Sequence, residues 1–257
     1  MRRLLTIIVL LLALILGIGL FAAFTRKNSA ASAEETPAAA SPLPAETPEP
    51  SAEPSPDPSA FTDTESLLVV ANKKHRLPEG YVPPDLVTPN IRQTQACQMR
   101  REAAEWIAKM AEAAAEDGVT LSISSAYRGE DYQRSLYENY KAQYGTETAD
   151  TISSRPGYSD HQTGLAADFV EGDGSFDGIN FNQSFETTGS GEWLRNHAHE
   201  YGFIMRYPKD KQDITGYAYE PWHYRYVGTD AATKIWTAGE FESFEEYYGV
   251  DGGDYAE

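Results

Sequence analysis

Residues 159–168 read SDHQTGLAAD and hold the most informative pattern in the chain. His161 lies on a predicted loop, whereas Asp168 lies within a short predicted strand. Because successive side chains of a strand point to opposite faces, Asp168 shares one face with Gly164 and Ala166. Its carboxylate therefore lies beside residues with almost no side chain, which leaves room for a metal ion and a substrate. A buried carboxylate without such a partner would be costly.

A second pattern, YAYEPWHY at residues 217–224, places Glu220 three positions before His223. In a straight strand these two side chains would face opposite ways. Pro221, however, fixes its own backbone and restricts the residue before it to an extended conformation. The pattern therefore predicts a bend at which the carboxylate and the imidazole point into one site.

The two patterns together provide two neutral imidazoles and one carboxylate, from His161, His223 and Asp168. Such a donor set holds a catalytic Zn2+ with a fourth, tetrahedral position open to water. Zinc would lower the pKa of that water towards about 7 and polarise a scissile carbonyl, while Glu220 takes the proton and later delivers it to the leaving amine. We therefore predict a zinc-dependent hydrolase that needs no nucleophilic serine or cysteine.

Two further histidines, His197 and His199, offer a rival pair of metal ligands. They fall within a helix predicted at residues 192–201, and residues two apart on a helix do not face each other. We therefore assign both histidines to packing or surface positions.

Helices and strands are interspersed along residues 61–257, which we interpret as one domain. Apolar residues at helical spacing predict a helix around residues 103–114, and the alternation that follows predicts a half-buried strand at residues 119–124. Further helices are predicted near residues 129–143, 192–201 and 230–237, and further strands at residues 165–170, 202–207 and 222–227. The strands do not alternate regularly with helices, so we expect an α+β fold in which helices flank a small, mainly antiparallel sheet.

The first 27 residues differ from the rest, because Arg2 and Arg3 are followed by an uncharged apolar run, Leu4–Phe24. A run of about 20 apolar residues spans a bilayer as a helix, whereas a cleavable signal peptide usually has an apolar region of about 7–15 residues. We therefore expect residues 1–27 to form a single-pass signal anchor in the cell membrane, with the catalytic domain outside the cytoplasm. Cleavage after Ala33, which would give a secreted protein, is the alternative.

Residues 28–60 consist largely of alanine, proline, serine, glutamate and threonine. Such a stretch cannot bury enough apolar surface to offset its ordering entropy, and its prolines keep it extended, so we predict a disordered spacer.

The net charge of −18 argues against nucleic acid or an anionic lipid surface as a partner. Part of that acidity lies in the C-terminal segment around Glu245, which we expect to be a solvated end. Cys97 is the only cysteine, so the domain has no internal disulfide. We expect it to be a monomer.

These motifs resemble those of the VanY-type zinc D-alanyl-D-alanine carboxypeptidases of bacteria, which share a fold with lysostaphin-like peptidases and hedgehog domains. The family pattern Ser-x-His-x-x-Gly-x-Ala-x-Asp is met in full within residues 159–168, and the Glu-x-x-His element is met by Glu220 and His223. The resemblance extends from about residue 81 to residue 228. It implies a set of zinc ligands, His161, Asp168 and His223, and a catalytic base, Glu220.

The resemblance also implies roles for residues outside the metal ligands. Arg128, at the end of a predicted strand, either binds the terminal carboxylate of the substrate or stabilises the tetrahedral oxyanion, and both roles suit its fixed donor fork. Four positions line the substrate pocket in relatives, and here they are occupied by Gln133, Ser159, Tyr217 and Trp222.

The resemblance leaves three functions to compare. The first is removal of the C-terminal D-alanine from a peptidoglycan stem peptide, at a D-Ala-D-Ala bond or at the bond that joins L-lysine or diaminopimelate to D-alanine. The second is an endopeptidase of the same fold, which would need a groove open at both ends. The third is a non-catalytic, zinc-containing wall-binding module, which would have lost the base or a ligand. This sequence keeps both, so we favour the carboxypeptidase.

Overall fold

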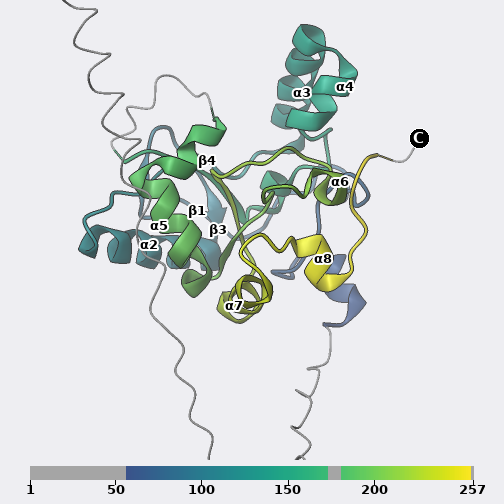
Figure 1. Cartoon of the computed structure of the whole chain (residues 1–257). Coiled ribbons are helices and arrows are strands. Elements are labelled where there is room, and N and C mark those ends of the chain that lie inside the picture. Colours follow the sequence, from purple (N-terminus) through teal and green to yellow (C-terminus); the bar gives the residue numbers. More distant parts are fainter. Residues whose placement is uncertain (1–55, 173–180, 256–257) are drawn as a thin grey trace, which may run out of the picture. The chain divides into compact units, whose positions relative to one another are not determined.

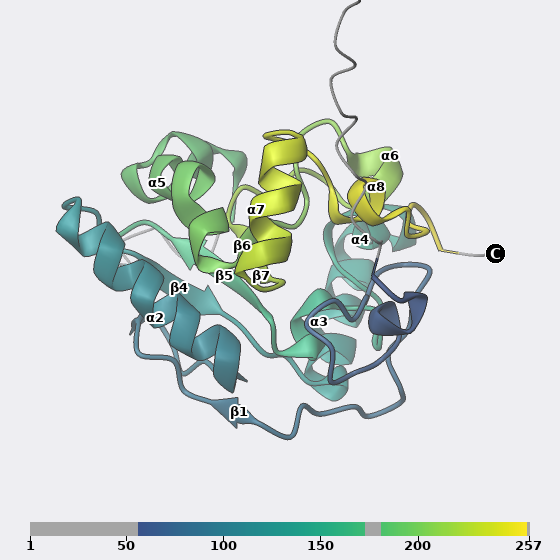
Figure 2. The ribbon, with the colours of Figure 1, turned by 90° about the horizontal axis from the view of Figure 1, so that it is seen from below.

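The computed structural model describes residues 56–172 and 181–255 (Figures 1 and 2). The predicted anchor, residues 1–27, and the predicted spacer as far as residue 55 lie outside the described residues. Within the described residues, no helix has the length and apolar character needed to cross a bilayer. The described residues form one compact unit.

The structured part of the chain begins before residue 61. Pro58–Phe61 form a short 3-10 helix, η1, capped by the side chain of Asp57. The Phe61 ring packs edge-on against Phe244, with ring centroids 6.1 Å apart, and lies 5.3 Å from the ring of Tyr248. The last residues of the predicted spacer therefore belong to the folded unit.

The main sheet has five strands in the order β2-β4-β5-β7-β6, and its β2–β4 pair is parallel whereas the other three pairs are antiparallel. The mainly antiparallel α+β fold expected from the sequence is confirmed. The strands of this sheet are β2 (Arg92–Gln93), β4 (Ser122–Ser125), β5 (Ala166–Val170), β6 (Phe203–Met205) and β7 (His223–Tyr226). A separate antiparallel pair is formed by β1 (Leu86–Val87) and β3 (Met99–Arg100).

The predicted helices are present, with boundaries shifted by a few residues. The helix expected at residues 192–201 is two elements, an α-helix that begins at Gly189 behind the capping hydroxyl of Thr188 and a 3-10 turn that follows it. The α-helices are α2 (Arg101–Glu116), α3 (Glu130–Tyr144), α4 (Thr146–Ile152), α5 (Gly189–His197), α6 (Gln212–Thr215), α7 (Thr229–Ala238) and α8 (Phe244–Tyr248). The remaining 3-10 helices are η2 (Asp160–Thr163), η3 (Gln183–Thr187) and η4 (Ala198–Tyr201).

The two faces of the sheet have different roles. Side chains of α2 and α5 pack with one face of the sheet in the main hydrophobic core, which includes Ala167 and Phe169 of β5. The alternate residues of β5, Ala166 and Asp168, point to the other face, as strand geometry requires. The carboxylate of Asp168 is thus directed away from the apolar core. In Figures 1 and 2, α3 and α4 lie side by side and apart from α2 and α5.

The strand predicted as half-buried is buried on both faces, so that expectation was wrong. Leu121 and Ile123 lie in the apolar core, and Ser122 and Ser124 are also buried. The two serine hydroxyls satisfy their hydrogen bonds inside the protein: Ser122 Oγ donates to Gly172 O at 2.6 Å, and Ser124 Oγ accepts from Thr94 Oγ1 at 2.9 Å. Burying a hydroxyl costs little when it is hydrogen-bonded, so the polar alternation did not indicate a solvent-exposed face.

The acidic C-terminal segment is not simply a solvated end, which corrects a second expectation. Glu245 on α8 is buried and accepts hydrogen bonds from both terminal nitrogens of Arg206, at 2.6 and 2.8 Å. It also accepts from Asn72 Nδ2 at 3.0 Å. The C-terminal segment therefore closes a buried ionic contact with the body of the domain.

We expect Glu245→Gln to lower the free energy of unfolding by about 3 kcal/mol, because buried Arg206 loses the carboxylate to which it donates two hydrogen bonds. Urea unfolding followed by circular dichroism measures this change. The matched control is Glu240→Gln, which removes an exposed carboxylate paired with Arg195 at 3.6 Å and should cost less than about 1 kcal/mol. Equal midpoints for the two variants would contradict the structural role of Glu245.

Candidate metal centre and its cleft

The backbone around His161 turns sharply before it enters β5. His161 lies in the 3-10 helix η2, which ends at Gly164 with a φ of +70°. A Cβ atom at Gly164 would lie 3.1 Å from side-chain atoms of Pro83, Leu86 and Arg100, so a larger residue would meet both strain and crowding. The glycine of the motif thus connects the histidine to the strand that carries the aspartate.

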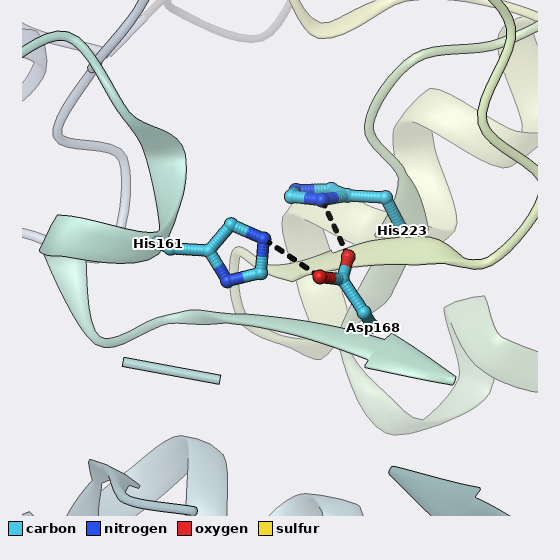
Figure 3. A group of neighbouring side chains, drawn as sticks. All are labelled: His161, Asp168 and His223. Atoms are coloured by element: carbon cyan, nitrogen blue, oxygen red, sulfur yellow. Dashed lines mark hydrogen bonds and ion pairs between the residues drawn. The ribbon is translucent and has the colours of Figure 1, made fainter. Parts of the chain in front are cut away.

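Strand pairing brings His223 next to Asp168. In the β5–β7 ladder, Asp168 is the direct partner of His223. Its Oδ1 lies 2.9 Å from His223 Nδ1, and its Oδ2 lies 3.1 Å from His161 Nε2 (Figure 3). The two imidazole rings meet edge to face at 4.7 Å. All three side chains are buried, and one potential ligand atom from each lies within 4.8 Å of the others.

In each imidazole, the nitrogen that does not face Asp168, here called the outer nitrogen, also has a hydrogen-bond partner. His161 Nδ1 lies 2.7 Å from Ala126 O, and His223 Nε2 lies 3.2 Å from Asp160 Oδ2. When those outer nitrogens donate, His161 Nε2 and His223 Nδ1 keep their lone pairs free to face inward. Histidines that bind metals are commonly held in this way by a carbonyl or carboxylate. The donor set and its surroundings therefore fit a metal ion.

The local electrostatics favour a positive charge at this centre. Burial disfavours a charged Asp168, but His161 and His223 hold its pKa well below the ordinary range. Burial, with help from Arg128, lowers the pKa of His161. For His223, burial acts downward, but hydrogen bonds to Asp160 and Asp168 raise its pKa to about 9. An anionic Asp168 and a neutral His161 are the protonation states that metal ligands need, and a bound metal ion would replace the proton that His223 holds towards Asp168.

The bend predicted at Pro221 is confirmed. Residues 220–223 form a turn closed by a hydrogen bond from His223 N to Glu220 O at 3.2 Å, with proline at its second position. Glu220 Oε2 consequently lies 3.7 Å from His223 Nδ1. Burial raises the pKa of Glu220 to about 7, although His223 opposes the shift. A carboxyl group whose pKa is near neutrality can both accept and return a proton.

Arg128 follows β4 and lies beside the same centre. Its Nη1 is 3.9 Å from Asp168 Oδ2, and its side chain is partly open to the cleft. Its buried Nε has no hydrogen-bond partner within the described part of the chain. The guanidinium therefore has donors available for an anionic group in the cleft.

A cleft of about 860 Å³ opens over the metal centre. Three of the four pocket residues expected from the sequence line it, and the hydroxyl of Ser159 has no hydrogen-bond partner among the described residues. These three are Ser159, Tyr217 and Trp222.

The fourth expected residue, Gln133, is not part of the lining. Its side chain is buried behind the wall and donates to Ser153 Oγ at 3.2 Å and to Ser154 O at 2.7 Å. Both serines line the cleft. Gln133 thus contributes by holding the wall in place.

One side of the cleft was not predicted from the sequence. Tyr132, Leu136 and Tyr140 line one side, and their four-residue spacing places them on one face of α3. That periodicity was available in the sequence as a possible signal. Asp160 was also missed as a site residue, because the sequence pattern gave it no partner.

The assignment of His197 and His199 to packing and surface positions is confirmed. His199 stacks on Trp236, with ring centroids 4.0 Å apart and an interplanar angle of 6°. His197 lies 3.1 Å from Glu200 and packs on Trp193. Neither belongs to the metal-binding group found among the described residues.

Comparison with known proteins gives a consistent match. Residues 96–229 match the VanY family, described as D-alanyl-D-alanine carboxypeptidase. The chain is also 41% identical over 176 residues to the YodJ protein of Bacillus subtilis (strain 168), a match that covers 66% of this chain and 63% of that relative. The chain therefore spans less than two thirds of the length of this relative.

Two solved structures extend the likeness to the fold. The LdcB LD-carboxypeptidase, whose structure was described in terms of peptidoglycan recognition, is 38% identical with a TM-score of 0.67, over 73% of this chain and 88% of that one. A mutant of the vancomycin-resistance D,D-pentapeptidase VanY in complex with Zn(II) is 32% identical with a TM-score of 0.57, over 70% and 97% of the two chains.

Proposed function

Because this chain belongs to the VanY family of D-alanyl-D-alanine carboxypeptidases, we propose that it removes the C-terminal D-alanine from peptidoglycan stem peptides, using a zinc ion held by His161, Asp168 and His223. The observation that carries the proposal is the position of Glu220, a partly buried carboxyl group that lies 3.7 Å from His223 Nδ1 and lines the same cleft. A wall-binding module would have no need for a proton acceptor beside its metal.

Zinc and Glu220 have different roles in the proposed reaction. Zinc, when bound, supplies a Lewis acid that polarises the scissile carbonyl and makes water acidic enough to ionise near neutral pH. Glu220 accepts a proton from the attacking water and returns it to the amine that leaves. The pKa of about 7 that burial gives Glu220 supports both halves of this role.

Arg128 supplies the positive charge that the substrate needs. A stem peptide ends in a carboxylate, and the reaction places further negative charge on the carbonyl oxygen. The guanidinium, with its unpartnered Nε and its opening to the cleft, can donate to either group.

We expect Arg128→Lys to lower kcat/KM by about 10²–10³-fold, the usual cost of removing one donor from an oxyanion site. Lysine keeps the charge but loses the planar fork. A rise in KM alone assigns Arg128 to the substrate carboxylate, whereas a fall in kcat assigns it to the oxyanion. Arg134→Lys, which changes an exposed arginine of α3, is the matched control. Unchanged kinetics in Arg128→Lys would contradict both roles.

Two bonds are candidates for cleavage, and we favour the one between the L-centre of lysine or diaminopimelate and D-alanine. The sequence identity to the LD-carboxypeptidase, at 38%, exceeds that to the D,D-pentapeptidase, at 32%. A tetrapeptide stem is therefore the expected substrate.

Incubation of the protein and Zn(II) with tetrapeptide and pentapeptide stems, followed by mass spectrometry, tests the function. The full chain, or a fragment that begins at residue 53 and so keeps η1, is suitable. Loss of one D-alanine from the tetrapeptide is the expected result, and loss only from the pentapeptide would assign D,D specificity. Products cut within the stem or a cross-bridge would indicate an endopeptidase. No cleavage of any of these substrates would overturn the proposal.

The proposed location is the outer face of the bacterial cell membrane, with residues 1–27 as the anchor. This placement rests on the apolar run Leu4–Phe24 and on the wall peptide proposed as substrate. Sequencing the N-terminus of the mature protein tests it, because a start near Glu34 would mean that the protein is released.

A further inference from the structure

Asp160 is a buried carboxylate next to the metal centre that is not one of the three potential ligands. It directly precedes His161 in the chain, yet its Oδ2 faces the other histidine, 3.2 Å from His223 Nε2. Its Oδ1 accepts a hydrogen bond from Arg225 Nη1 and lies 4.0 Å from Arg206 Nε. Its side chain is fully buried. These contacts with two arginines restrict the rotation of the Asp160 carboxylate and keep it facing His223.

The arginines are themselves fixed by groups remote from the metal centre. Arg225 donates through Nη2 to Leu67 O at 3.0 Å and to Val69 O at 2.7 Å. Arg206 is held by its two hydrogen bonds to Glu245. The orientation of Asp160 is therefore determined by the surrounding protein, whether or not a metal is present.

We propose that Asp160 is a positioning residue that fixes the ring of His223 so that Nδ1 faces the metal. The inference rests on the metal centre of the proposed function. A hydrogen bond from Nε2–H of His223 to the carboxylate selects one tautomer and sets the rotation of the ring. It also makes Nδ1 a stronger electron-pair donor to the metal. His161 obtains the same restraint from a backbone carbonyl, Ala126 O, which no substitution can remove. Of the two groups that hold the histidine rings, Asp160 is therefore the one that can be tested by mutation.

The test is the affinity of the full-length chain for Zn(II) alone, measured by competition with a chromogenic chelator. Asp160→Asn keeps the shape of the side chain and removes its charge. We expect the dissociation constant for zinc to rise by about 10–100-fold, the usual effect of losing an outer partner of a histidine ligand. The readout does not depend on catalysis, so it separates metal binding from turnover.

The matched control is Glu130→Gln, which removes the charge of another buried carboxylate held by two arginines, Arg76 and Arg134, without touching Asp160 or His223. It should lose stability yet keep the wild-type zinc affinity within about 3-fold, well below the loss expected from an outer partner. Circular dichroism at the assay temperature verifies that both variants are folded. If Asp160→Asn does not fold, Asp160→Asn combined with Arg225→Gln removes the unpaired guanidinium and carries the same expectation.

Wild-type affinity in a folded Asp160 variant would overturn the inference and leave the proposed function standing. An equal loss in Glu130→Gln would also overturn it, because the effect would then follow from removing any buried carboxylate. A wild-type protein that does not bind zinc would overturn the metal centre itself, and the inference with it.

Discussion

Replacing Glu220 with glutamine lowers kcat by about 10²–10⁴-fold, the range expected when a general base is removed, while zinc remains bound. The amide has nearly the shape of the carboxylate but cannot accept the proton of the attacking water. Because Glu220 is not one of the three potential ligands, the metal content should match that of the wild type. Steady-state kinetics on the cleaved stem peptide, with metal analysis of the same samples, measures both quantities.

The same substitution should not destabilise the protein. Burial raises the pKa of Glu220 to about 7, which means that the folded protein disfavours its charged form. A neutral amide removes that cost, so the thermal midpoint should equal or exceed that of the wild type. Glu138→Gln, an exposed change on α3, is the control for activity. A Glu220→Gln enzyme with wild-type kcat would remove this residue from the role of base.

His161→Ala is expected to abolish stoichiometric zinc binding. A catalytic zinc site has three protein ligands, and the loss of one leaves only Asp168 and His223. The affinity should fall by more than the roughly 10–100-fold that accompanies loss of an outer partner. The substitution also removes the donor to Ala126 O, so the backbone at the edge of the cleft loses a contact.

Metal analysis after dialysis, followed by titration with Zn(II), measures the effect. His197→Ala is the matched control, because it removes a half-exposed histidine that packs on Trp193 away from the metal centre. Full zinc occupancy in His161→Ala would refute the ligand assignment, whereas zinc loss in both variants would point to unfolding.

The predictions that held depend on short stretches of chain. Alternation along β5 separates Asp168 from the core residues Ala167 and Phe169 over a few positions, and it follows from strand geometry alone. The turn that directs Glu220 and His223 to one site depends on a single proline between them. Local backbone rules of this kind can be applied to the printed sequence before any fold is known.

The expectations that failed depended on partners distant in sequence. Glu245 was expected in solvent because it belongs to an acidic segment without the spacing of metal ligands, but Arg206 lies opposite it in the fold and is buried with it. Ser122 and Ser124 were expected on an open face, yet their hydroxyls find partners at Gly172 and Thr94. A polar residue is excluded from the interior only when its hydrogen bonds are unsatisfied, and the sequence does not show that.

The sequence by itself determined the chemistry available to this protein: two histidines, an aspartate and a glutamate in two spaced motifs, with the turn that orients one of them. Only the tertiary structure decided how they meet. The β5–β7 register places Asp168 opposite His223, 55 residues away, and the buried arginines fix Asp160 behind that histidine. The physical reason is that side-chain type and local backbone preference are properties of each residue, whereas strand register and the pairing of buried charges arise only between segments brought together by folding.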